Sequence, residues 1–145
     1  MMRHPNHLTS GIAVLMILLI SDGVCADEVA VVSAKSTVTT LSKSQLVAIF
    51  LGKLTRFPDG SEAVPIDQLE GTPARDEFYA TVAGKSAAQM KAYWSRIIFT
   101  GRGQPPKAVS SSSEAKKLLV ANPNTISYIE PKLVDDTLKV VTVTQ

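Results

Sequence analysis

Short runs of β-branched and apolar residues alternate with capped helical segments along residues 29–143, and this alternation constrains the fold most strongly. The runs that predict strands cover 29–33, 63–66, 125–129 and 138–143. Helices are expected between them, so we predict one α/β domain with helices on both faces of a sheet. A length of 145 residues, 45% of them hydrophobic, allows one ordinary domain with a packed core.

Two serines stand three residues before a glutamine, which is the spacing of a capping box at a helix start. Ser42 opens a helix that Gly52 ends, and Ser86 opens the segment with the strongest helical periodicity in the chain. Five apolar residues of this second helix follow the spacing i, i+3, i+4, i+7 and i+8, namely Met90, Tyr93, Trp94, Ile97 and Ile98. We expect this stripe to pack into the core rather than to form a stacking platform.

A third helix is expected to begin after Thr72. Thr72 is a favourable N-cap, and Pro73 suits the first position of the helix. Asp76 and Glu77 lie close to the positive end of the helix dipole. Two interpretations follow, because the carboxylates could satisfy an ordinary helix start, or the start could hold an anion.

The first 26 residues have the layout of a secretory signal. Arg3 gives the start of the chain a positive charge, residues 11–20 form an uncharged apolar block, and Val24 and Ala26 occupy the −3 and −1 positions of a cleavage site. The rival interpretation is a transmembrane anchor, but ten residues are about half of the ~20 needed to cross a bilayer. Cys25 lacks the residues that usually precede a lipid-modified cysteine.

Removal of a signal peptide of residues 1–26 leaves a domain of residues 27–145 that is expected in the periplasm and has no histidine or cysteine. This excludes Ser–His and Cys–His catalysis, His/Cys zinc sites and disulfides. Four carboxylates could in principle form an acid/base pair, although nothing suggests a substrate cleft around them: Asp67, Glu70, Asp76 and Glu77. We therefore expect no enzyme, no cofactor and no metal site. A net charge of +2 gives no argument for nucleic acid.

Two further features have plain structural interpretations. The stretch Gly101-Arg102-Gly103 lacks the lysine spacing of a nucleotide-binding loop and precedes prolines, which predicts a turn. The adjacent Asp135 and Asp136 are expected to be solvated rather than to bind a cation.

A series of short motifs follows in a fixed order between residues 41 and 143. The motifs are Ile49-Phe-Leu-Gly-Lys53, Phe57-Pro-Asp-Gly60, Val64-Pro-Ile-Asp-Gln68, Gly71-Thr72, Phe78, Tyr93-Trp94, Phe99-Thr-Gly101, Pro105-Pro106, Asn122-Pro123 and Ile126-Ser-Tyr-Ile129. This order resembles the phosphate-binding proteins of ABC transporters, which are periplasmic solute-binding proteins of the type II clamshell class. The resemblance implies a single-lobe periplasmic-binding-protein-like domain, with a mixed, mostly parallel sheet and helices on both faces.

The resemblance also implies a position for an oxyanion. In the family, a Gly-Ser-Gly-Thr loop opens a helix and holds phosphate with hydroxyls and backbone N–H groups, helped by an arginine just upstream. Residues 71–74 match this loop, with a proline in place of a glycine and an alanine in place of a hydroxyl residue. The position of the family's arginine falls near Asp67 and Gln68, and neither residue is cationic. Arg75 would therefore supply the positive charge, unless it is a surface or ion-paired residue. The candidate ligand-binding residues are Gly71, Thr72 and Arg75.

Two functions follow as expectations. The first is a periplasmic protein that binds phosphate or a related oxyanion in ABC-type phosphate uptake or sensing. Because one lobe leaves the ligand half solvated, it implies weak affinity, or a second copy or partner that completes the pocket. Its expected partners are an ABC transporter permease or another envelope protein, and a homodimer. The alternative is a ligand-free protein–protein interaction module of the envelope that retains one lobe of the fold.

Overall fold

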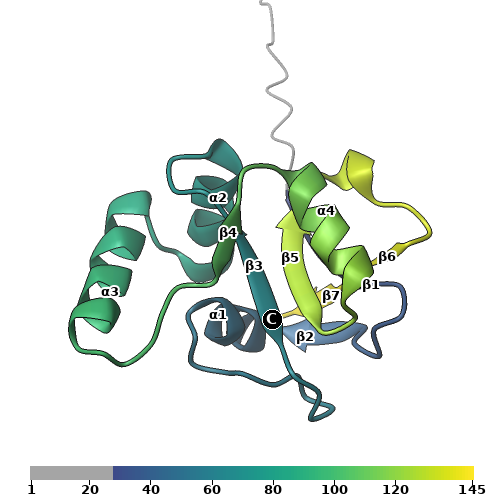
Figure 1. Ribbon diagram of the computed structural model, residues 1–145, viewed down its shortest axis with the longest axis horizontal. Coiled ribbons are helices and arrows are strands. Elements are labelled where there is room, and N and C mark those ends of the chain that lie inside the picture. Colours follow the sequence, from purple (N-terminus) through teal and green to yellow (C-terminus); the bar gives the residue numbers. More distant parts are fainter. Residues whose placement is uncertain (1–27) are drawn as a thin grey trace, which may run out of the picture.

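The computed structural model describes residues 28–145, and the expected signal peptide lies outside them. Its centre is a five-stranded sheet in the order β4-β3-β5-β1-β6 (Figure 1). The strands are β1 (Val29–Ser33), β3 (Val64–Gln68), β4 (Lys107–Val109), β5 (Thr125–Ile129) and β6 (Leu138–Val140). Strand β3 pairs in parallel with β4 and β5, whereas β1 pairs antiparallel with β5 and β6. Four strands therefore run the same way and only β1 is reversed, which confirms the mixed, mostly parallel sheet.

A second, two-stranded sheet joins β2 (Thr40–Ser42) to β7 (Thr142–Thr144) in parallel. The sequence predicted one strand over 138–143, and this was wrong because the chain changes sheets at Val141. The Val141 side chain is buried, and its N–H donates to the Ala30 carbonyl at 2.9 Å. Strands β2 and β4 were not expected, since three residues are too short to establish an alternating pattern.

The helices are α1 (Lys43–Phe50), α2 (Pro73–Phe78), α3 (Ala87–Phe99) and α4 (Ser112–Ala121). A π-helical turn, η1 (Tyr79–Ala83), continues α2, and a short 3-10 turn, η2 (Pro131–Leu133), follows β5. Both predicted capping boxes are confirmed, with the hydroxyls of Ser42 and Ser86 each accepting from a glutamine N–H at 3.2 Å. Within residues 28–145, no helix combines the length and apolar character that a membrane crossing requires.

Packing on the two faces of the sheet creates two cores. The first contains buried side chains of α1, α2 and α3, among them Phe50, Phe78 and Met90, and the second contains those of α4. Strand β1 alternates between them, with Val32 in the first core and Val31 in the second. Helices therefore cover both faces, as expected.

Helix α3 lies at one edge of the molecule, away from the sheet (Figure 1). Its first half packs into the core through Met90 and Trp94, as the periodicity predicted. The prediction was wrong for Ile98, which is 54% exposed, because in the last turn of the helix it is the neighbouring Ile97 that packs against the core. The neighbouring Phe99 is 93% exposed. The helix thus ends in two large apolar side chains that face solvent.

Candidate functional site

A buried carboxylate, Asp67, stands near the end of β3 and collects donors from three elements. Its Oδ2 accepts hydrogen bonds from the Tyr79 hydroxyl at 2.7 Å and from Arg75 Nε at 3.4 Å, and its Oδ1 accepts one from the Tyr128 hydroxyl. Burial, followed by the negative charge of Asp67, raises the pKa of both tyrosine hydroxyls far above the usual value. Both phenols therefore remain protonated donors, and the network ties β3 to α2, η1 and β5.

The side chain of Arg75 belongs to this buried network. It is only 7% exposed, and its guanidinium carbon lies 5.2 Å from the centre of the Tyr79 ring. The carboxylate of Asp67 is its ion-pair partner. The structure therefore places Arg75 in an ion pair rather than at a ligand site. Its side chain does not line the pocket that opens beside the start of α2.

A pocket of about 420 Å³ opens between the starts of α2 and α4. Its polar lining comes from the end of β3, from the two helix starts and from three carboxylates: Gln68, Thr72, Ser110, Ser111, Ser112, Glu28, Glu77 and Glu130, with Pro73 and Ala74 beside them. Gln68 Nε2 donates to Ser112 Oγ and to the Tyr128 carbonyl, both at 3.2 Å. These bonds hold β3, β5 and the start of α4 in one arrangement around the pocket.

The predicted loop at the start of α2 lies at the edge of this pocket. Thr72 lines it and stands at the N-cap position, but its hydroxyl donates to the Leu69 carbonyl at 2.8 Å and caps no helix N–H. The side-chain cap expected of Thr72 was therefore wrong, because the hydroxyl is turned back toward the Leu69 carbonyl and accepts no hydrogen bond from a helix N–H. Gly71 has a φ of 87°, the left-handed conformation that favours glycine, and it is not part of the lining. The structure thus brings Thr72 to the pocket and leaves Gly71 and Arg75 outside its wall.

Three glutamates make the pocket acidic, which could not be predicted from the sequence. Glu28 precedes β1, Glu77 lies on α2 and Glu130 follows β5, so only the folded chain brings them to one cavity. Burial, then the charges of Glu130 and Glu77, raises the pKa of Glu28 from 4.5 to about 7. Within residues 28–145, Glu28 Oε2 is buried without a hydrogen-bond partner.

Glu28 should make the stability of the protein depend on pH. Because folding raises its pKa from 4.5 to about 7, the native protein retains a proton that the unfolded chain has lost between these values. The contribution of Glu28 to the free energy of unfolding should therefore be greatest below about pH 4.5, and it should be lost as the pH rises through about 7. Glu28→Gln should flatten this decline and raise Tm at about pH 8. Thermal unfolding across this range measures it, and parallel profiles for the two proteins would contradict the shift.

The other carboxylates of the sequence prediction have separate surroundings. Glu70 is exposed and pairs with Lys91 at 3.7 Å, whereas Asp67 is fully engaged in its buried network. Asp135 pairs with Lys116 at 2.5 Å rather than being simply solvated. Among residues 28–145, no group of three His, Cys, Asp or Glu side chains is arranged to hold a metal ion.

No family model matches the sequence, and no curated protein matches it either. Solved structures do match. A Clostridium perfringens protein described as a phosphate ABC transporter substrate-binding protein, solved with bound phosphate, superposes with a TM-score of 0.62 at 24% identity. An ABC-type phosphate transport receptor from Vibrio cholerae gives 0.63 at 19%, and PstS from Borrelia burgdorferi gives 0.62 at 13%. This is the fold of phosphate receptors of ABC transporters.

The phosphate-receptor fold confirms the resemblance that the ordered motifs indicated. Each of the three superpositions covers 81% of this chain but only 44%, 46% and 47% of the respective receptor. The chain therefore spans less than half the length of these proteins, as expected for a single lobe. By their descriptions, they are substrate-binding and transport receptors rather than enzymes.

Proposed function

We propose that this protein is a periplasmic solute-binding-like protein of reduced size that binds phosphate or a related oxyanion, in association with ABC-type phosphate uptake or sensing. The observation that carries the proposal is the pocket of about 420 Å³ next to Thr72, Pro73 and Ala74. These residues correspond to the phosphate loop in the resemblance, and the fold is that of the phosphate receptors.

The donors for an oxyanion come mainly from the start of α4. The first residues of a helix have no intrahelical partner for their N–H groups, so the N–H group of Ser112, which lines the pocket, is available to a ligand. The helix dipole adds partial positive charge at the same place. Thr72 contributes from the opposite wall, while Gly71 shapes its turn. Arg75 acts indirectly, through its ion pair with Asp67, the residue before Gln68.

The three glutamates determine which oxyanion fits. A carboxylate repels a bare anion, but it accepts a hydrogen bond from an oxyanion that carries a proton. Phosphate carries such a proton near neutral pH and sulfate does not, so the pocket should prefer phosphate. Lower pH should favour binding further, because Glu28 becomes neutral as the pH falls below about 7.

Phosphate binding should therefore be weak at about pH 8 and tighter at about pH 5.5. Glu77→Gln and Glu130→Gln should each increase the affinity for phosphate at the higher pH by about fivefold, because each removes a negative charge from the pocket wall while its amide oxygen can still accept a hydrogen bond from the phosphate proton. Calorimetric titration of the purified protein with phosphate, and with sulfate as the comparison anion, measures this.

The matched control is Glu62→Gln, because Glu62 lies before β3, at the end of the strand opposite Gln68. This variant should titrate like the wild type. A folded protein that gives no saturable heat with phosphate at either pH would refute the proposal. It would favour the ligand-free interaction module.

A further inference from the structure

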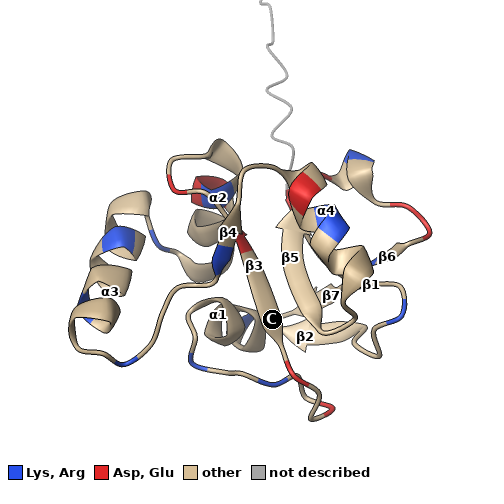
Figure 2. Cartoon of the chain, viewed as in Figure 1, with Lys and Arg blue, Asp and Glu red and all other residues tan. Residues whose placement is uncertain are grey.

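Helix α3 lies in a segment of the chain whose charged residues are all basic. Residues 78–113 contain five basic residues and no acidic one: Lys85, Lys91, Arg96, Arg102 and Lys107. Figure 2 shows the basic positions along α3 and in the loop at its end, without an acidic position between them. The same helix ends in the exposed side chains of Ile98 and Phe99. Positive charge and exposed apolar surface therefore occur together at the edge of the molecule.

The residues at this end are held in one arrangement. The Thr100 hydroxyl donates to the Arg96 carbonyl at 2.9 Å, and the N–H of Gly101 donates to the Ile98 carbonyl at 3.1 Å. The N–H of Arg102 reaches the Ile97 carbonyl at 3.1 Å, so the loop folds back onto the last helical turn. We call Arg96, Ile98, Phe99 and Arg102 the α3 tip.

A cavity of about 350 Å³ adjoins the α3 tip. Lys53, Arg96 and Arg102 line it together with Tyr93 and Trp94, and no acidic side chain of the described part of the chain does. Within residues 28–145, none of these three cations has an ion-pair partner. The C-terminal ends of α1 and α3 also lie at this cavity. Each adds about half a unit of negative charge, so together they offset about one of the three positive charges and leave about +2. The cavity is therefore suited to an anion.

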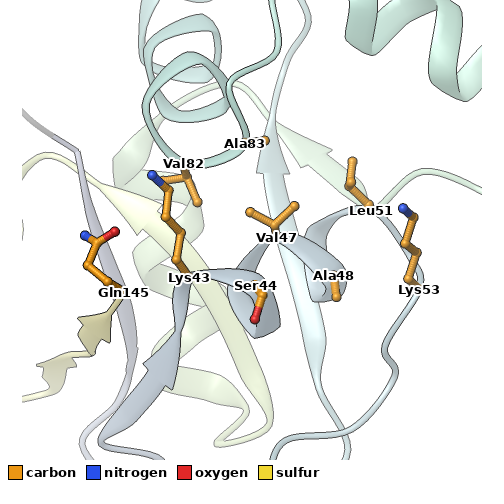
Figure 3. Close-up of a pocket in the computed structure, with 9 residues that line it drawn as sticks. All are labelled: Lys43, Ser44, Val47, Ala48, Leu51, Lys53, Val82, Ala83 and Gln145. Atoms are coloured by element: carbon orange, nitrogen blue, oxygen red, sulfur yellow. The ribbon is translucent and has the colours of Figure 1, made fainter.

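An apolar groove continues from this cavity. It has a volume of about 480 Å³ and shares Leu51 and Lys53 with the cavity. Val47 lies in its middle, with Val82 toward the end that carries Lys43 and Leu51 toward the end that carries Lys53 (Figure 3). The cationic cavity is thus flanked by an apolar groove and by the exposed Phe99.

We propose that the α3 tip docks on an anionic phospholipid surface. A lipid phosphate group occupies the cavity between Lys53, Arg96 and Arg102, and Phe99 enters the interfacial layer. Basic residues beside an exposed aromatic ring are the combination that binds proteins to anionic membranes. Free phosphate would bind the three basic side chains of the cavity, but it would leave Phe99 and the apolar groove exposed to water. A protruding helix end also fits a soft, flat surface better than the concave site of another protein.

Vesicle co-sedimentation of the full protein tests this docking. We expect binding to vesicles that contain phosphatidylglycerol, little binding to pure phosphatidylcholine, and weaker binding as salt is added. The double variant Arg96→Glu with Arg102→Glu should bind more than about 25-fold more weakly, at about fivefold per charge removed. Phe99→Ser should lose about tenfold. Lys117→Glu and Val120→Ser, at exposed positions of α4 on the other face, should bind like the wild type.

Three results would overturn the docking proposal. They are no association with phosphatidylglycerol at low salt, equal association with both kinds of vesicle, and binding of soluble phosphate through Arg96 without binding of vesicles. Gel filtration of the wild type and Phe99→Ser adds a fourth, because a dimer lost in the variant would identify a second copy as the occupant. None of these outcomes depends on the pocket between α2 and α4, whose variants are at Glu77 and Glu130.

Discussion

Replacement of Asp67 by alanine is expected to lower the free energy of unfolding by about 3–5 kcal/mol. The carboxylate is 3% exposed and is the ion-pair partner of Arg75, which is 7% exposed. Its removal leaves a buried guanidinium without a counter-charge and the hydroxyls of Tyr79 and Tyr128 without their acceptor. Urea denaturation followed by circular dichroism measures the change.

Two variants separate the charge of Asp67 from its hydrogen bonds. Asp67→Asn retains an acceptor for one tyrosine and should cost less than alanine. Asp136→Ala, at an exposed aspartate, should change the free energy of unfolding by no more than about 0.5 kcal/mol. An Asp67→Ala protein as stable as Asp136→Ala would show that the network contributes nothing to the native state.

Replacement of Phe78 by alanine is expected to cost about 3–5 kcal/mol as well. The Phe78 ring stacks on Tyr128 at a centroid distance of 3.9 Å and an angle of 8°, and its edge meets Phe50 at 4.9 Å. The deletion leaves a cavity between α1, α2 and β5 that these rings cannot close by small movements. Because Phe78 ends α2, the same change should loosen the helix that carries Thr72.

Phe99→Ala is the matched control, since it makes the same substitution at a position that is 93% exposed. It should stay within about 0.5 kcal/mol of the wild type in urea denaturation. Phe78→Leu should fall between the two, because it fills part of the cavity. Similar losses for Phe78→Ala and Phe99→Ala would contradict the packing described for α2.

Local signals made most of the fold predictable. The capping boxes at Ser42 and Ser86 depend on residues three apart, and the strands at 29–33 and 125–129 are continuous runs, so the sequence contains all that specifies them. The break at Val141 could not be predicted, because it depends on a contact with β1 far away in the chain. Ile98 had the correct spacing for a buried residue, but spacing does not tell how far the core extends along a helix.

The candidate site was less predictable for the same physical reason. The sequence indicated the loop at Thr72, and Thr72, Pro73 and Ala74 of this loop line the pocket. Gln68 lines it too, although the sequence indicated only that this position lacks a positive charge. The partners of Asp67 were not visible, since Tyr128 is 61 residues away from it. Nor could periodicity reveal that Glu28 and Glu130 lie at one cavity, which only the pairing of β1 with β5 produces.

The position of β1 in the sheet determines how late in folding the sheet can be completed. It is the first strand of residues 28–145, yet it is an interior strand whose partners are β5, about 100 residues later, and β6. As the chain leaves the ribosome or crosses a membrane from its N-terminus, this strand must wait, unpaired, until nearly all of the remaining residues have emerged. Completion of the sheet is therefore a late, non-local step, and a chain shortened before β5 would keep its first strand without either neighbour.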